Sequence, residues 1–285
     1  MSLTNVPRHI VGESRPSQRR ASGRNLKLGI EYDGSNYCGW QVQNSPQTIV
    51  PASAKASAGR HRPQRKSIQE VIEKILHKIL QEKVRLIASG RTDAGVHALA
   101  QAANFKTNSK IAPHKLQRAL NGLLPDDIAI TGIEEESLRF HSRFDAKSKV
   151  YRYSILNRAY PSAFLRNKAY FYPYPLNIKI MQKEARGILG RHNFKSFQAS
   201  GSAAKNAVRT IKKIKIAKVK DLIYIDIEAD GFLYNMARNI TGTLIEIGRG
   251  RFPERSLKKI LNSRNRKIAG PTAPACGLCL LKVKY

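Results

Sequence analysis

Apolar residues along the chain recur with two periods, and these periods predict both strands and helices. Every second residue from Leu26 to Tyr32 is apolar, which is typical of a half-buried strand, and an Asp-Gly turn follows it. Between 68 and 80 apolar residues recur every three or four positions, and Ser67 begins a capping box, so we predict a helix there. The same reasoning predicts strands at 84–88, 98–105, 127–133, 149–156, 168–172 and 277–284, a β-hairpin at 208–219 and 222–229, and helices at 113–123, 178–189, 233–247 and 253–262.

The order of these elements predicts an α+β fold with antiparallel sheets, because neighbouring strands are not regularly separated by helices. A short internal similarity adds a second expectation. The segment IEYDGSNY at 30–37 resembles IEADGFLY at 227–234, and each stands where a strand ends. We therefore expect two α+β halves with related layouts, at 26–138 and 139–285.

Two segments interrupt the apolar pattern, and both are basic. Residues 1–25 hold five Arg and one acidic residue, Glu13, which predicts a solvated, disordered tail, although an organelle transit peptide has a similar composition. Residues 50–66 carry five positive charges and no acidic residue. We expect this second segment to be a mobile insertion in a surface loop, where added length costs little.

Composition narrows the range of functions. The 285 residues include 51 Lys and Arg against 20 Asp and Glu, a net charge of +31 that favours an anionic partner, most simply a nucleic acid. No apolar run is long enough to span a membrane, and the N-terminus lacks the apolar segment of a secretory signal. Cys38, Cys276 and Cys279 are too few for a disulfide scaffold and fit a reducing compartment. One CxxC without a second pair does not predict a metal site.

The loop after the predicted strand at 84–88 is the first candidate for chemistry. Asp93 lies there between Gly90 and Gly95, two residues after Arg91. Glycines allow a tight turn and a close ligand, and an adjacent Arg keeps a carboxylate ionised, as a nucleophile requires. A turn Asp that caps its own backbone, with Arg91 as a surface charge, explains the same spacing.

The segment GRTDAGVH at 90–97 resembles the signature of the tRNA pseudouridine synthase A family. Further segments resemble the family in the same order, and the resemblance covers roughly 26–285. These segments are GIEYDGSNY at 29–37, GWQ at 39–41, FHSRFDA at 140–146, YRY at 151–153, NF and SF at 193–194 and 196–197, MARN at 236–239 and GPTAPA at 270–275. The resemblance implies two ferredoxin-like (RRM-like) halves that form a largely antiparallel sheet, with flanking helices and a central active-site cleft.

The resemblance also implies an activity and its residues. The family isomerises uridine to pseudouridine without a cofactor: the N1–C1′ bond breaks, the uracil turns, and a C5–C1′ bond forms. Asp93 matches the catalytic aspartate, which either attacks the nucleotide or abstracts a sugar proton to give a glycal. Arg238 matches the arginine that pairs with it, Tyr151 the tyrosine that packs on the target base, and Arg91 the residue associated with flipping the base out of its stack. His97 is expected to be structural.

The expected partner is tRNA, at uridines 38–40 of the anticodon stem-loop, bound by a cytoplasmic homodimer with no membrane contact and no small-molecule cofactor. Two other functions remain open at this point. A non-catalytic RNA- or ribosome-binding protein would share the charge and the fold class, but it has no use for an acidic residue facing RNA. A DNA-binding protein would need a helix-turn-helix or zinc finger, and the sequence has neither signal.

Overall fold

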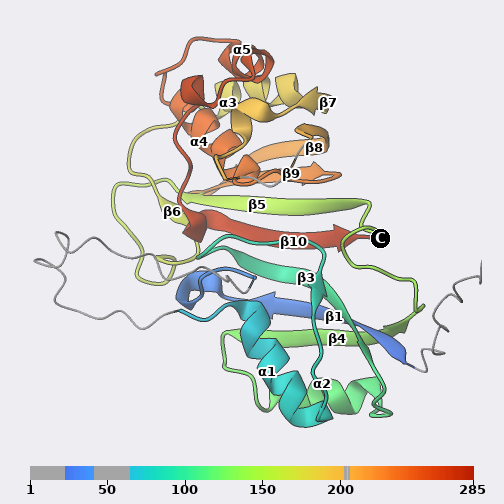
Figure 1. Cartoon of the computed structure of the whole chain (residues 1–285). Coiled ribbons are helices and arrows are strands. Elements are labelled where there is room, and N and C mark those ends of the chain that lie inside the picture. Colours follow the sequence, from blue (N-terminus) through green and yellow to red (C-terminus); the bar gives the residue numbers. More distant parts are fainter. Residues whose placement is uncertain (1–22, 42–64, 202–203, 205) are drawn as a thin grey trace, which may run out of the picture.

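The computed structural model describes residues 23–41, 65–201, 204 and 206–285, and its centre is one mixed sheet (Figure 1). Eight strands follow each other in the order β4-β1-β3-β10-β5-β9-β8-β7, while β2 pairs with β3 and β6 with β5. The strands are β1 (Arg24–Tyr32), β2 (Ile87–Ala88), β3 (His97–Thr107), β4 (Ile128–Glu136), β5 (Ser148–Leu156), β6 (Tyr170–Phe171), β7 (Gly190–Asn193), β8 (Val208–Val219), β9 (Leu222–Ala229) and β10 (Leu278–Lys284). The α-helices are α1 (Ile68–Leu80), α2 (Pro113–Asn121), α3 (Ile178–Ala185), α4 (Met236–Gly248) and α5 (Ser256–Ser263).

The sheet consists of two copies of one arrangement. In the first, β1, α1, β2, β3, α2 and β4 follow along the chain, and their strands lie in the antiparallel order β4-β1-β3-β2. In the second, β5, α3, β8, β9, α4 and β10 follow in the same way, in the antiparallel order β10-β5-β9-β8. Both are the ferredoxin-like βαββαβ unit, which confirms the predicted fold class. They join where β3 and β10 run parallel over a short stretch.

The helices form two groups that leave the middle strands between them. Helices α1 and α2 pack on the first unit, and α3, α4 and α5 on the second (Figure 1). Alternation along β5 shows which side is covered: Tyr151, Tyr153 and Ile155 are buried, while Arg152 between them is only half-buried and pairs with Asp226. Within the described segments, no helix is long and apolar enough to cross a bilayer.

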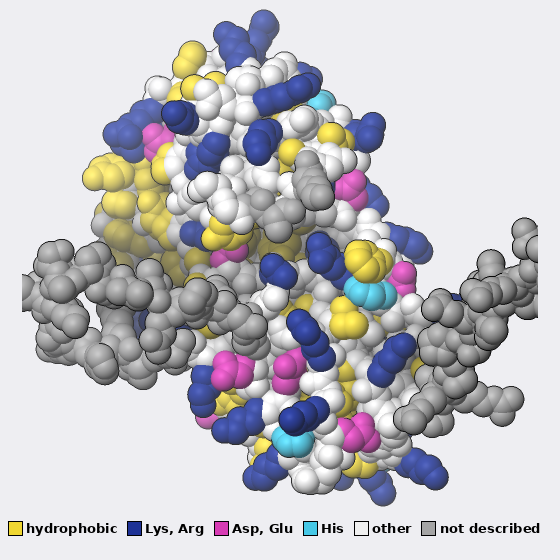
Figure 2. Space-filling model, viewed as in Figure 1, with side chains coloured by type: hydrophobic (Ala, Val, Ile, Leu, Met, Phe, Trp, Pro, Cys, Tyr) yellow, Lys and Arg dark blue, Asp and Glu magenta, His cyan; other side chains and the backbone are white. Residues whose placement is uncertain are grey.

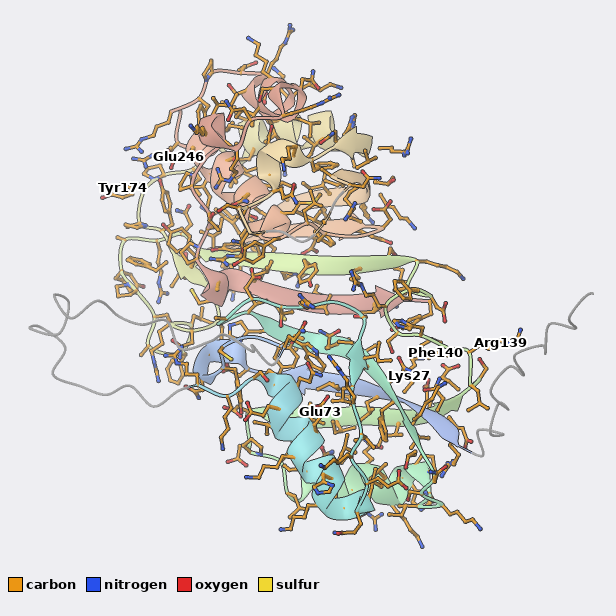
Figure 3. All side chains as sticks on the ribbon, viewed as in Figure 1. Lys27, Glu73, Arg139, Phe140, Tyr174 and Glu246 are labelled. Carbon is orange, nitrogen blue, oxygen red and sulfur yellow. The ribbon has the colours of Figure 1, made fainter. Side chains whose placement is uncertain are left out.

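The first strand starts earlier than predicted, so the last residues of the expected 1–25 tail belong to the fold. Asn25 is fully buried, and its side-chain amide donates to the carbonyls of Ser137 and Phe140 at 2.8 and 3.0 Å. Lys27 lies two residues further along the same side of the strand, 5.6 Å from the centre of the Phe140 ring, and Figure 3 shows the two side chains together. Residues 1–22 of the tail lie outside the described residues.

Most of the predicted basic insertion, up to residue 64, also lies outside the described residues, but its end belongs to the ordered chain. The carbonyl of Lys66 accepts a hydrogen bond from the backbone N–H of Cys38 at 3.2 Å. Ser67 then caps α1 through the N–H of Glu70, as the capping-box pattern predicts. The predicted division between residues 138 and 139 falls in the connection from β4 to β5, and it stays a prediction.

Several predicted elements are shorter than expected, among them the strand predicted at 168–172, which pairs only at Tyr170 and Phe171. The strand expected at 84–88 pairs only at Ile87 and Ala88, because the N–H of Leu86 donates instead to the Glu73 carboxylate of α1 at 2.8 Å. The helix expected at 178–189 ends at Ala185 and tightens into a 3₁₀ turn. The strand β7, whose sequence GRHN has no apolar alternation, follows without having been predicted.

Candidate active site

The loop that carries Asp93 forms hydrogen bonds with β1 and with the turn that follows this strand. Trp40 donates its backbone N–H to the carbonyl of Thr92 at 3.0 Å, and the hydroxyls of Tyr32 and Thr92 lie 2.8 Å apart. Gly39 makes this approach feasible, since its φ is 107° and a Cβ there would lie 2.7 Å from the Thr92 oxygen. The GWQ segment therefore helps to shape the loop.

Polar side chains of β3 and β5 form hydrogen bonds with the start of the same loop, at Ser89 and Gly90. Gln101 of β3 accepts from the Ser89 hydroxyl at 2.6 Å and donates to the carbonyl of Gly90 at 2.9 Å. Lys149 of β5 donates to the carbonyl of Ser89 at 2.5 Å. Beyond Asp93, Gly95 has a φ of 77°, which closes the turn in a conformation that favours glycine. The loop thus has anchors from both units.

Asp93 and Arg238 form an ion pair between the two units. A guanidinium nitrogen (Nη1) of Arg238, near the start of α4, donates to Oδ2 of Asp93 at 3.1 Å. The same guanidinium is held by the carbonyl of Ala273 at 2.8 Å and by the side chain of Asn235 at 3.0 Å. The Asp93 side chain is 24% exposed and that of Arg238 16%. The structure therefore brings together two residues that the resemblance paired across 145 positions.

The charge of Asp93 is only partly compensated. Burial raises the pKa of its carboxyl above the ordinary value, and Arg238 acts in the opposite direction. The second oxygen, Oδ1, accepts no hydrogen bond from any described residue, so it is free to face a substrate. Arg91 is exposed and makes no ion pair with Asp93 among the described residues, which agrees with the interpretation of Arg91 as a surface charge.

Tyr151 lies on β5 with its ring buried. Its ring meets that of Phe232 edge to face, with centroids 4.8 Å apart. Burial, followed by the nearby Tyr32 and Asp93, raises the pKa of the Tyr151 hydroxyl, so the phenol stays protonated at neutral pH. No described residue forms a hydrogen bond with that hydroxyl, which leaves it available as a donor.

His97 is built into the scaffold. Its Nδ1 accepts from the N–H of Gly34 at 3.1 Å and lies 3.0 Å from a carboxylate oxygen of Asp33, and its Nε2 lies 3.2 Å from the carbonyl of Cys276. Burial lowers the pKa of the ring, so His97 is neutral at neutral pH. With both nitrogens engaged, it joins the first turn to the segment before β10.

The described residues contain no cluster of three or more His, Cys, Asp or Glu that could hold a metal ion. Cys276 and Cys279 are free thiols, and burial raises the pKa of both.

Comparison with known proteins identifies the family. The family model described as tRNA pseudouridine synthase matches residues 30–145 and 185–285. The chain belongs to the tRNA pseudouridine synthase family. The matched ranges contain Arg91, Asp93 and Arg238, whereas Tyr151 falls between them.

Curated relatives of this synthase agree along their whole length. It is 45% identical to tRNA pseudouridine synthase A of Thermoanaerobacter sp. (strain X514) and of Acetivibrio thermocellus, and 44% identical to that of Clostridium acetobutylicum. Each alignment covers 92% of this chain and 100% of the relative. Like the other family members, this protein is an enzyme.

Sequence reasoning did not single out Lys149 or Phe232. Lys149 stands two residues before Tyr151, so it lies on the covered side of β5, where a lysine is unusual. This spacing of two residues from Tyr151 was the sequence feature that could have identified Lys149. Phe232 has no such feature, because its role depends on the distant β5.

Proposed function

We propose that this synthase isomerises uridine to pseudouridine in tRNA, with Asp93 as the catalytic carboxylate. The observation that carries the proposal is the ion pair of Asp93 with Arg238, which holds a partly buried carboxylate with one free oxygen. A protein that merely binds RNA gains nothing from a buried negative charge, whose desolvation is costly. Isomerisation needs a carboxylate at the sugar and no redox group.

Asp93 serves either of two routes. In one, Oδ1 attacks C1′ and the bonding pair of the N1–C1′ bond leaves with the uracil. In the other, the carboxylate takes the C2′ proton and the same bond breaks to give a glycal. In the first route C5 then displaces Oδ1 of Asp93 from C1′, and in the second C5 bonds to C1′ while C2′ takes back a proton. In both routes C5 loses its proton and N1 gains one, so no external oxidant is needed. Arg238 orients the carboxylate in both routes.

Tyr151 and Arg91 are assigned to the base. The ring of Tyr151 packs against the uracil, because the flat faces of an aromatic ring and a base stack on each other. Its phenol is protonated, so it acts as a hydrogen-bond donor to the detached uracil. Arg91 is exposed on the loop next to Asp93, a position suited to filling the stack when the uridine flips out.

The finer substrate assignment follows the family resemblance. We expect the target uridines at positions 38–40 of the anticodon stem-loop, a homodimer that binds one tRNA across both subunits, and a cytoplasmic location. The synthase's relatives are named for tRNA, and Figure 2 shows Lys and Arg side chains across the viewed face, as a polyanionic substrate requires. Transcripts that keep uridine at only one of these positions test which position is modified. Sedimentation of the free protein tests whether it is a homodimer.

The decisive experiment is tritium release from tRNA that carries 5-tritiated uridine. Asp93→Asn should abolish release while tRNA binding persists, because the amide keeps the shape and loses the charge. Asp126→Asn is the matched control, since Asp126 is exposed and makes no hydrogen bond within the described residues. Equal release from the wild type and Asp93→Asn would refute the assignment.

A further inference from the structure

Lys149 carries a positive charge that no acidic residue balances. Its amine, at the start of β5, donates to the carbonyl of Ser89 at 2.5 Å. An ammonium group has three N–H donors, and the described residues engage only this one. No described carboxylate forms an ion pair with it. A half-buried charge without a counterion is costly, so the site favours an anion.

The surroundings of Lys149 add positive charge. Burial, followed by Arg143 and Arg209, lowers the pKa of the Lys149 amine to about 8. Arg143 is exposed, and its guanidinium lies 5.7 Å from the Phe144 ring without a hydrogen bond among the described residues. Arg209 is held by the carbonyls of Asn206 and Val208 at 3.0 and 2.6 Å. The three cations come from the β4–β5 connection, β5 and β8.

The Lys149 amine lies close to the backbone of Gly90, where only glycine leaves room for it. A Cβ at Gly90 would lie 2.9 Å from the Lys149 Nζ, so any other residue at this position would crowd the amine. Ser89 and Gly90 belong to the loop that carries Asp93, and Lys149 lies two residues from Tyr151 on the same side of β5. An anion bound here would therefore sit beside the reacting nucleotide.

We propose that Lys149, Arg143 and Arg209 form a phosphate site for the RNA backbone next to the target uridine. One N–H of Lys149 holds the loop through Ser89, and the remaining N–H groups and the two guanidinium groups contact one phosphate. Lys149 is thus a positioning and binding residue that ties docking of the strand to the place of Asp93. The inference rests on the proposed function, which supplies RNA as the ligand.

Salt dependence of binding tests the site directly. For a labelled unmodified tRNA, the logarithm of the association constant falls linearly with the logarithm of the salt concentration, and each phosphate contact contributes a slope of about 0.7 to 0.9. Lys149→Gln should weaken binding and reduce the slope by about that amount. Lys213→Gln removes the same charge from a groove lined by Val150, on the opposite side of β5, and should change the slope much less. Equal changes in both variants would overturn the proposal.

Arg143→Gln separates phosphate binding from loop positioning, because it leaves the bond from Lys149 to Ser89 intact. It should also reduce the slope, and the double variant should lose less than the two single losses together, since both residues contact one phosphate. Wild-type slopes in both single variants, with a lower kcat only in Lys149→Gln, would show a purely structural lysine. If Lys149→Gln does not fold, the Arg143→Gln slope decides.

A chemically altered RNA locates the phosphate. In a series of anticodon stem-loop RNAs, each phosphate in turn is replaced by a neutral methylphosphonate. One replacement next to the target uridine should weaken binding to the wild type but not further weaken binding to Lys149→Gln. Additive losses at every position would refute the site. These binding measurements do not depend on turnover. If the Asp93→Asn variant were active, the proposed function would be overturned, but the evidence for the phosphate site would be unaffected.

Discussion

The Asp93 carboxylate has two opposed influences on its charge, and Arg238 is the smaller one. Burial raises its pKa, and the arginine only partly offsets this. An acid with a raised pKa is ionised only at higher pH, so activity that needs the carboxylate is lost as the pH falls through that raised value. The acid limb of the rate profile should therefore lie above the range of an ordinary aspartate.

Replacement of Arg238 by Gln should move this acid limb further toward higher pH and lower kcat, because the one effect that lowers the pKa of Asp93 is removed. The measurement is kcat/KM as a function of pH, with Arg249→Gln as the control. Arg249 follows α4 and lies 3.5 Å from Glu246 on the same helix. An unshifted acid limb in Arg238→Gln would contradict the role of the pair.

The ring and the hydroxyl of Tyr151 have separate roles, the first in packing and the second in chemistry. Its ring packs against Phe232, whereas its hydroxyl has no partner among the described residues. Tyr151→Phe should thus change the free energy of unfolding by less than about 0.5 kcal/mol, as for substitutions that break no contact. Turnover should fall, because the proposed hydrogen-bond donor to the uracil is lost. Tyr151→Ala, which also removes the ring, should cost about 3 to 5 kcal/mol. Denaturant unfolding together with single-turnover rates checks both, and full activity in Tyr151→Phe would limit the residue to packing.

At the scale of elements, the sequence predicted an element well where its local pattern and its long-range contacts favour the same structure. The hairpin of β8 and β9 has the predicted bounds, because alternation and turn both specify it. The strand β2 is short because the Glu73 carboxylate, from a helix earlier in the chain, takes a backbone donor. The strand β7 is polar, so only its pairing with β8 defines it.

The candidate site was predictable only in part for the same reason. The loop around Asp93 is contiguous and recognisable, while its partner Arg238 lies on another unit and was found through resemblance alone. Lys149 looks like a solvent-facing charge until the burial of its side of β5 is known.

The contact between the first turn and the catalytic loop provides a prediction at this scale. Gly39→Ala places a Cβ against the Thr92 carbonyl in a conformation that side chains rarely adopt, so the loop must shift. We expect a loss of at least about 1 kcal/mol in the free energy of unfolding and a lower kcat. Gly132→Ala in β4 is the matched control, because a Cβ there meets nothing within 4 Å. Similar effects in both variants would argue against the loop contact.

For the whole molecule, the excess charge belongs mainly to the folded body. Residues 1–25 and 50–66 carry net charges of +4 and +5, which leaves +22 of the +31 for the remainder. Binding of a long polyanion should therefore depend chiefly on the ordered surface, and the phosphate site around Lys149 is one part of it.

Deletion of residues 50–64 tests this division of charge. The deletion removes Lys55, Arg60 and Arg62 but keeps Lys66, whose carbonyl is bonded by Cys38, and the cap at Ser67. Because Asp93, Arg238 and Tyr151 are held by other elements, kcat should be unchanged, and tRNA affinity should fall by less than about tenfold. A full-length variant with the three cations changed to Gln separates charge from chain length. Complete loss of turnover in the deletion variant would mean that the segment takes part in the site itself.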